Sequence, residues 1–248
     1  MGKDGQKGGE SDRFPTTRRS AIFALASDDP AERARSFERI AHAYYKPIYK
    51  YARVKWRKTS EEAEDIAQEF FARALKRGTF GAYDPSRARF RTFIRTCVDR
   101  FIVDDRRATR AVKRGGGIPS MQLDVADAEA ELARASLPAD APLDDYFDAE
   151  WMRHLITMSV ESLREECDRK RKQQHFRLFE RLHLEPQGET PSYAELAKET
   201  GISVMDVTNR LSYARREFRR IVLDTLREIT ATEEEFVSEA QAVLGIRP

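Results

Sequence analysis

The sequence contains few cysteines and no long apolar run. Its 248 residues include two cysteines, Cys97 and Cys167, which lie far apart and form neither a CxxC pair nor a Cys/His cluster. Their spacing argues against a disulfide scaffold and a zinc finger. No apolar stretch approaches the roughly 20 residues that a membrane-spanning helix requires, and the first residues lack the apolar core of a signal peptide. The sequence therefore predicts a soluble, cytoplasmic protein.

Motifs for catalysis and for metal binding are also missing. No Ser/His/Asp pattern or phosphate loop occurs, no Glu-x-x-His motif accompanies the acidic residues at 61–69, and the four histidines lack metal-ligand spacing. One cluster of acidic residues suggests an alternative, an enzyme with a carboxylate metal site, although helical periodicity spreads its members over more than one face. That cluster is Glu61, Glu62, Glu64, Asp65 and Glu69. The favoured prediction is a protein that is not an enzyme and has no cofactor and no metal. Metal analysis of the purified protein would distinguish it from the metal-dependent enzyme.

The formal net charge of +2 conceals two segments of opposite charge. Residues 85–114 contain ten basic and three acidic residues, whereas residues 124–150 contain nine acidic residues and a single base, Arg134. A basic block is suited to binding a polyanion. An acidic block is suited to a solvated linker or to a mimic of nucleic acid.

Apolar residues recur at helical spacing through most of the chain, and no segment alternates with a period of two. Thr59 and Glu62 have the spacing of a capping box, which predicts a helix from Glu61 to about Arg77 that ends at Gly78. Another capping pattern, Thr232 with Glu235, predicts a short C-terminal helix. The sequence therefore predicts an all-α protein.

Residues 192–220 have the pattern of a helix-turn-helix. Ser192 and Ser203 each precede an acidic residue by three positions, which predicts two helix starts, and Gly201 lies between them. The second helix repeats apolar residues on one side and presents short polar residues and arginines on the other. This distribution favours a helix that reads the major groove of DNA, with a solvated helix face as the alternative. The outward residues are Thr208, Asn209, Ser212, Arg215, Arg216 and Arg219.

Three segments together resemble bacterial RNA polymerase sigma factors: EDIAQEFFARAL at 64–75, FRTFIRTCVDRFIVDDRR at 90–107 and the helix-turn-helix. The middle module of such factors is missing, which is typical of the extracytoplasmic-function (ECF) class of the sigma-70 family. FPTTR at 14–18, KRGGG at 113–117 and the tail after Arg220 resemble a subgroup of this class with an N-terminal extension and a C-terminal helix.

The resemblance implies two helical domains, a sigma region 2 bundle and a sigma region 4 helix-turn-helix, joined by an acidic flexible linker. The expected boundaries are a disordered leader at 1–13, the region 2-like domain at 14–114, the linker at 115–147, the region 4-like domain at 148–228 and a C-terminal helical extension at 229–248. In the family the linker runs toward the RNA exit path. Residues 124–148 are predicted either to run toward the RNA exit path in the same way or to form a solvated spacer.

The resemblance also implies partners and site residues. The first domain is expected to bind the clamp helices of the largest subunit of core RNA polymerase through Glu64, Asp65, Gln68 and Glu69. It is expected to bind the downstream promoter element through Arg100, Asp104, Arg106, Arg107, Arg110, Lys113 and Arg114. The second domain is expected to bind the upstream element through Ser203, Thr208, Asn209, Arg210, Ser212, Arg215, Arg216 and Arg219.

Two residues depart from the family pattern in the segment for the downstream element. Phe93 stands where the family often has Trp, and it falls on the apolar stripe, which favours a place in the core. Arg100 stands where the family usually has Asn, so the sequence does not identify the residues that form the pocket for a promoter base.

The expected assembly is a monomer that binds polymerase and promoter DNA, with an anti-sigma factor as a possible further partner. The alternative function is a stand-alone helix-turn-helix regulator, which would normally dimerise on a palindromic site. The C-terminal helix could cover the DNA-reading domain or bind a regulator, and the sequence does not decide between them.

Overall fold

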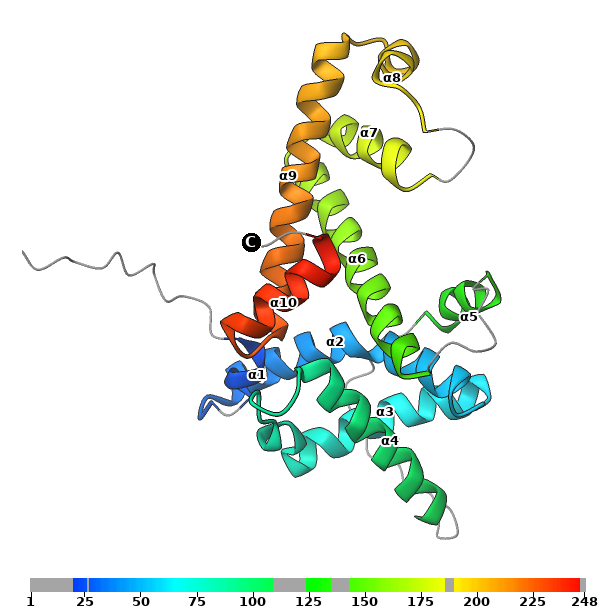
Figure 1. Ribbon diagram of the computed structural model, residues 1–248, viewed down its shortest axis with the longest axis vertical. Coiled ribbons are helices and arrows are strands. Elements are labelled where there is room, and N and C mark those ends of the chain that lie inside the picture. Colours follow the sequence, from blue (N-terminus) through cyan, green and yellow to red (C-terminus); the bar gives the residue numbers. More distant parts are fainter. Residues whose placement is uncertain (1–19, 26, 109–123, 135–142, 186–189, 246–248) are drawn as a thin grey trace, which may run out of the picture.

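The computed structural model describes residues 20–25, 27–108, 124–134, 143–185 and 190–245. Over these ranges the chain forms α-helices and one short 3-10 turn, with no strand. The predicted all-α class is therefore confirmed. Figure 1 shows a lower bundle of helices from which two long helices, α6 and α9, rise to a helix-turn-helix at the far end.

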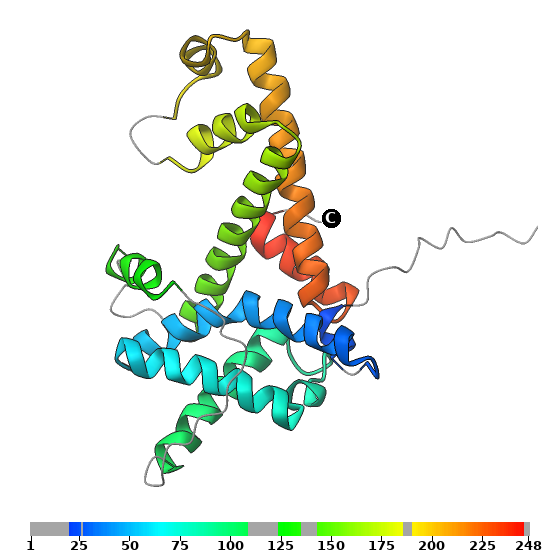
Figure 2. The same cartoon turned by 180° about the vertical axis from the view of Figure 1, so that it is seen from behind.

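The N-terminal half contains α1 (Ala21–Ala24), α2 (Pro30–Val54), α3 (Ser60–Arg77), the 3-10 turn η1 (Thr79–Ala82) and α4 (Phe90–Ala108). The rest contains α5 (Val125–Arg134), α6 (Leu143–Arg169), α7 (Gln173–His183), α8 (Tyr193–Thr200), α9 (Val204–Ile229) and α10 (Glu233–Leu244). Seen from behind, α2 and α3 cross the lower bundle with α4 beneath them (Figure 2).

The predicted helix caps are present. Thr59 and Glu62 form a full capping box at the start of α3, and Gly78 ends that helix with φ 61°. At α8 the capping box consists of Ser192 and Glu195. Because a positive φ strains any residue with a Cβ, glycine suits the end of α3.

Three apolar clusters follow one another from the bundle to the helix-turn-helix. The largest joins α1 to α4 with the first half of α6, the second half of α9 and α10, and it buries Tyr44, Trp151 and Leu226. The second lies between α6, α7 and the middle of α9 around Phe179. The third, which includes Leu211, holds α7, α8 and the start of α9 together. The long helices α6 and α9 thus belong to both ends of the molecule.

The expectation of a flexible linker is wrong for residues 125–134. These residues form α5, which lies against α2 and buries Ala128 completely. Carboxylates of α5 accept hydrogen bonds from α2, including Lys46 Nζ to Asp127 at 2.7 Å and Arg53 Nε to Glu129 at 2.7 Å. The reason is electrostatic: the acidic block has a cationic face of α2 to pair with, which composition alone does not reveal.

The helix α6 also begins inside the segment that was expected to be a linker. It starts at Leu143, with Asp144 and Asp145 in its first turn, where carboxylates stabilise the positive end of the helix dipole. Tyr146 and Phe147 then enter the main core. The expected boundary between linker and second domain, at residues 147 and 148, therefore falls inside the first turns of α6.

The C-terminal helix α10 attaches to the start of α4. The Glu235 carboxylate accepts hydrogen bonds from Phe90 N at 2.6 Å and from Ala231 N at 2.8 Å. Thr232 caps α10 as predicted, but the full capping box was wrong, because Glu235 bonds to these backbone groups instead of Thr232 N. Phe90 N is one of the amides that a helix start leaves without an internal partner, so α10 completes α4.

A second carboxylate of α10, Glu239, is almost completely buried and pairs with Arg91 at 2.9 Å. Arg91 also pairs with Asp148 of α6 at 3.4 Å and lies over the Trp151 ring. Burial raises the pKa of Glu239 above its ordinary value, although Arg91 and Arg89 act in the opposite direction. One buried arginine thereby joins α4, α6 and α10.

His154 makes the stability of the fold depend on pH. Its Nε2 lies 3.0 Å from the His42 carbonyl oxygen, and burial lowers the pKa of His154 to about 4. The unfolded chain therefore binds a proton below the ordinary histidine pKa of 6.5 that the folded chain does not bind, so stability is lost as the pH falls through this range. Going from about pH 7 to about pH 5, we expect this residue to lower the free energy of unfolding by about 2 kcal/mol.

Urea unfolding at the two pH values measures the change in the free energy of unfolding, and His154→Gln should remove the contribution of His154 to that change. The same pH dependence in both proteins would show that His154 is not its source.

Candidate nucleic-acid and polymerase interfaces

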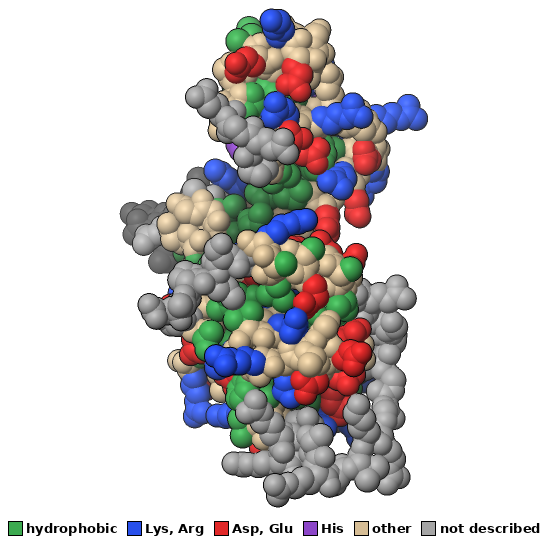
Figure 3. All heavy atoms as spheres, turned by 90° about the vertical axis from the view of Figure 1, so that its right-hand side faces the viewer, with side chains coloured by type: hydrophobic (Ala, Val, Ile, Leu, Met, Phe, Trp, Pro, Cys, Tyr) green, Lys and Arg blue, Asp and Glu red, His purple; other side chains and the backbone are tan. Residues whose placement is uncertain are grey.

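The outer face of α3 carries the four residues expected to bind polymerase. Asp65 and Gln68 are exposed, whereas Glu64 and Glu69 are half-buried. Gln68 Nε2 donates to Glu64 at 3.3 Å, and Glu69 pairs with Arg73 at 2.7 Å. The structure brings the four side chains together on one acidic helix face, and acidic side chains gather along one edge of the lower body in Figure 3.

The opposite side of α3 is held firmly by aromatic packing. Phe71 stacks on Tyr45 of α2 with ring centroids 6.1 Å apart, and Phe70 meets Phe101 of α4 edge to face at 5.9 Å. Burial, with Glu64 and Asp65 nearby, raises the pKa of Tyr45 to about 12, so its hydroxyl is neutral. The acidic face is therefore presented by a helix with a fixed orientation.

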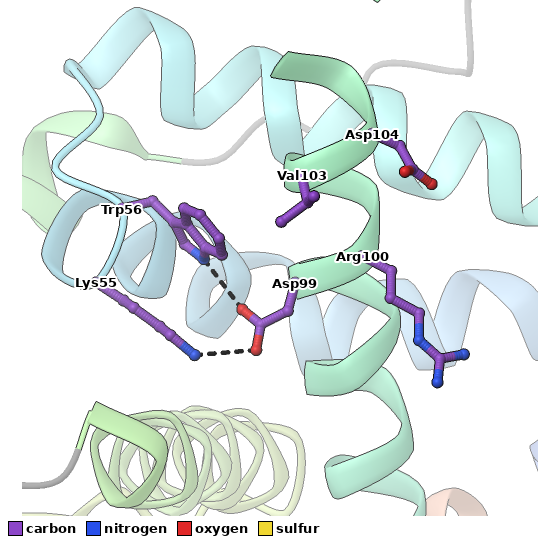
Figure 4. A pocket seen from close by; sticks show the side chains of 6 residues that line it. All are labelled: Lys55, Trp56, Asp99, Arg100, Val103 and Asp104. Atoms are coloured by element: carbon purple, nitrogen blue, oxygen red, sulfur yellow. Dashed lines mark hydrogen bonds and ion pairs between the residues drawn. The ribbon is translucent and has the colours of Figure 1, made fainter. Parts of the chain in front are cut away.

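A hollow of about 560 Å³ opens beside α4, lined by Lys55, Trp56, Asp99, Arg100, Val103 and Asp104. In Figure 4, Trp56 and Val103 face each other across it, whereas Arg100 and Asp104 project from the other side of α4. Arg100 and Asp104 are both exposed. The hollow thus combines an aromatic ring with neighbouring cations, the two features that bind unstacked bases and phosphates.

Asp99 organises this hollow, and sequence analysis missed it. Its carboxylate accepts from Trp56 Nε1 at 3.0 Å and from Lys55 Nζ at 2.9 Å. Tyr51 OH donates to the same carboxylate at 3.2 Å. Asp99 falls among arginines in the sequence, and only the packing of α4 on the end of α2 shows that it fixes the indole.

The side chains of the other five residues expected to bind the downstream element are not described by the structure. Arg106 and Arg107 lie on α4, but their side chains are outside the described part of the structure, as are Arg110, Lys113 and Arg114 entirely. Phe93 packs against the main core, with ring centroids 5.3 Å from Tyr83 and 6.0 Å from Phe90. Its expected place on the apolar side of α4 is confirmed, with the side chain half-buried against the core.

The helix α9 presents one row of side chains on its outer face. Asn209, Ser212, Arg216 and Arg219 are all exposed and recur at spacings of three or four residues, so they share one face of the helix. The opposite side buries Val207, Leu211 and Ala214. Polar side chains near the helix start and arginines further along are arranged as base and phosphate contacts require.

Other predicted residues of α9 lie apart from this row or make contacts of their own. Arg210 is half-buried on another side of the helix, where its guanidinium donates to Gln174 of α7. Arg215 donates to His183 at 3.1 Å and to Tyr193 OH at 2.9 Å. The Ser203 hydroxyl caps α9, and the Thr208 hydroxyl donates to the Val204 carbonyl at 2.9 Å.

Two exposed apolar residues at the start of α9 were not singled out from the sequence. Val204 is 48% exposed and Met205 is 71% exposed. Met205 lies one turn before Asn209 on the same face, where an apolar side chain is suited to contact the methyl group of thymine. The sequence offered a signal for them, because two apolar residues in the first turn of a helix predicted to read DNA fall outside its apolar stripe.

A comparison with protein-family models matches the ECF sigma factor family over residues 27–224. The chain belongs to this family. Comparison with curated proteins and with solved structures gives no match. The protein is thus an ECF sigma factor of the sigma-70 family, a family of DNA-binding, non-enzymatic transcription initiation factors.

The matched region of this sigma factor runs from the loop before α2 into α9, so it includes α5 and excludes α10. Among the described residues, no group of three or more His, Cys, Asp or Glu side chains is placed to hold a metal ion. No helix in the described ranges is both long and apolar enough to cross a bilayer.

Proposed function

We propose that this sigma factor, acting as a monomer in the cytoplasm, binds core RNA polymerase through α3 and promoter DNA through α4 and α9. The observation that carries the proposal is the separation of the three surfaces. The acidic face of α3, the hollow beside α4 and the polar row of α9 lie on different helices, and each has the chemistry that its partner requires.

For polymerase, we propose that Glu64, Asp65, Gln68 and Glu69 contact the clamp helices of the largest subunit. Their charge suits a basic partner helix, and the aromatic packing behind α3 fixes the position of the face. Charged groups across such an interface contribute to both specificity and association rate.

For the downstream element, Arg100 and the basic residues that follow in the chain are proposed to contact the phosphates of opened DNA. Trp56, held by Asp99, provides a ring on which an unpaired base could stack. Stacking of this kind contributes about 1 to 3 kcal/mol per base. Asp104, Arg106, Arg107, Arg110, Lys113 and Arg114 complete the proposed set.

For the upstream element, Asn209 and Ser212 are proposed to read base edges, with Thr208 and Ser203 at the start of the same helix. Arg215, Arg216 and Arg219 are proposed to contact phosphates. Arg210 has a supporting role instead, because its guanidinium bonds to Gln174 and lies off the polar row.

The proposal is tested by transcription in vitro with purified core polymerase over a library of promoters. The expected result is a complex with one sigma factor per polymerase and initiation at a defined set of sites. Absence of binding to core polymerase, together with a stable dimer on a palindromic site, would support the stand-alone regulator instead.

The double substitution Arg216→Ala with Arg219→Ala is expected to weaken upstream-element binding. Because each arginine is proposed to neutralise one phosphate, the salt slope should fall by about 2, about one unit for each arginine removed. Fluorescence anisotropy with promoter duplex at several salt concentrations measures the slope. Arg210→Ala is the control and should leave the slope unchanged. A smaller slope in Arg210→Ala, with no change in the double variant, would contradict the assignment.

A further inference from the structure

The described parts of the acidic block, residues 124–134 and 143–150, lie along cations of α2 and α4. Asp127 and Glu131 both accept from Lys46, each at 2.7 Å. At the start of α6, Asp144 pairs with Lys55 at 3.3 Å and with Arg95 at 3.4 Å. The block therefore covers positive charge on the bundle, up to the edge of the hollow that Lys55 lines.

Beneath α5, three cations of α2 form what we call the α2 strip: Lys46, Lys50 and Arg53. They are spaced four and three residues apart, so they lie on one face of the helix. Lys50 is bonded to both Glu131 of α5 and the buried Glu150 of α6. Among the described residues, Lys50 therefore keeps a carboxylate partner when α5 is absent, whereas the carboxylate partners of Lys46 and Arg53 all lie on α5.

The contacts of Arg53 are those that a guanidinium makes with a phosphate. Its Nε and Nη2 donate to the two oxygens of Glu129 at 2.7 and 2.8 Å, a bidentate geometry. Tyr49 OH donates to the same carboxylate at 2.6 Å. These neighbours lower the pKa of Glu129 to about 2, Arg53 being the main cause. An oxyanion other than a carboxylate would find the same donors.

Charge rather than apolar packing holds α5 in place. Ala128 is the one side chain of α5 classed as buried, while Val125 and Leu132 are only partly covered. The carboxylates that reach Lys46 remain open to water, with side-chain exposures of 53% for Asp127 and 31% for Glu131. The Lys46 side chain is itself 11% exposed, so these pairs are screened by salt less than surface pairs are. A polyanion that reaches Lys46 from the open carboxylate side would offer it equivalent charge-assisted contacts and can therefore compete with α5.

From these contacts we infer that α5 is an internal mimic of nucleic acid, and that the α2 strip binds the phosphate backbone of DNA when α5 leaves it. The carboxylates of α5 stand where phosphates would lie. The strip is a third nucleic-acid surface, separate from the polar row of α9 and from the exposed cations of α4. Its DNA binding needs no polymerase, so its test is independent of the proposed function.

The test uses the full chain with Asp127→Asn, Glu129→Gln and Glu131→Gln combined, which removes the mimic's charge but keeps its shape. The probe is a fluorescein-labelled oligothymidylate, and its binding is measured by anisotropy over a range of salt. Relative to wild type, we expect binding about tenfold tighter and a salt slope steeper by about 1.4, from two phosphate contacts at about 0.7 each. Equal affinity and equal slope in both proteins would overturn the inference.

Two further variants identify the surface. Glu38→Gln, Glu161→Gln and Glu165→Gln combined make the same change in net charge at exposed positions outside α5, and this control should keep the wild-type slope. Adding Lys46→Gln and Arg53→Gln to the α5 variant should abolish its gain. A gain that persists without these two cations, or that the control reproduces, would overturn the inference.

Hydrogen exchange on the wild-type protein gives a measurement that needs no substitution. We expect oligothymidylate to reduce the protection of amides in residues 125–134 while those of α2 remain protected, because local opening of α5 leaves the bundle core intact. Unchanged protection of residues 125–134 at saturating oligothymidylate would overturn the inference.

Discussion

Reversing two charges on α3, with Asp65→Lys and Glu69→Lys, is expected to weaken association with core RNA polymerase about 100-fold or more. Removing one partner of a buried, hydrogen-bonded charge pair costs about 2 to 5 kcal/mol, and reversal adds repulsion against a basic partner helix. Pull-down of core polymerase and titration by fluorescence anisotropy measure the effect. Transcription in vitro should fall with it.

The fold should survive this change. Asp65 is exposed, and Arg73, which no longer pairs with Glu69, keeps its position over the Phe101 ring. The ion pair that is removed from the helix is worth about 0.5 kcal/mol.

The chain offers a matched control for this charge reversal. Glu161 and Glu165 are exposed on α6 at the same spacing of four residues, so their reversal to lysine makes the same change in net charge. The α3 interface would be contradicted if the α3 reversal left polymerase binding at the wild-type level. It would also be contradicted if both reversals reduced binding equally.

Removing α10 by ending the chain at Ala231 is expected to lower the free energy of unfolding by about 5 kcal/mol or more. Deleting a buried Phe side chain such as Phe236 costs about 3 to 5 kcal/mol by itself, and removal of a helix cap costs about 1 kcal/mol more. The truncation also takes Glu239 from the buried Arg91, whose remaining ion pair among the described residues is with Asp148. Urea unfolding followed by tryptophan fluorescence measures the change.

Point variants separate these contributions. Phe236→Ala tests packing and Glu235→Gln tests the cap on Phe90 N, whereas the exposed Glu234 changed to Gln is the control. If the truncated chain unfolds at the same urea concentration as the full chain, α10 does not stabilise the bundle and the hydrogen bonds of Glu235 do not contribute to the free energy of unfolding.

Local signals explain what the sequence could predict. The side chains of Thr59, Ser192 and Ser203 each accept a hydrogen bond from the amide three residues further along, so these caps act within one helical turn and can be predicted from local sequence. The outward row of α9 follows from helical periodicity alone. The family resemblance likewise depends on short segments in a fixed order, and the family comparison confirms it.

The features that the sequence did not predict depend on partners far away in the chain. Glu129 meets Arg53 across 76 residues, and Glu235 meets Phe90 N across 145. A count of acidic residues shows that a block is negative, but not whether a cationic face lies opposite it. Arg210 shows the same limit at short range, because its exposure depends on where α7 packs.

The hydrogen bond from Phe90 N to Glu235 also has a consequence for when the bundle can fold during translation. A polypeptide emerges from the ribosome N-terminus first, and its domains generally fold as they appear. Here the amide of Phe90 is capped by a residue 145 positions further along the chain, and the core around Tyr44 includes residues of α10. The bundle therefore reaches its native form only after α10 has emerged from the ribosome, and a nascent chain arrested before Glu235 exposes an incomplete core.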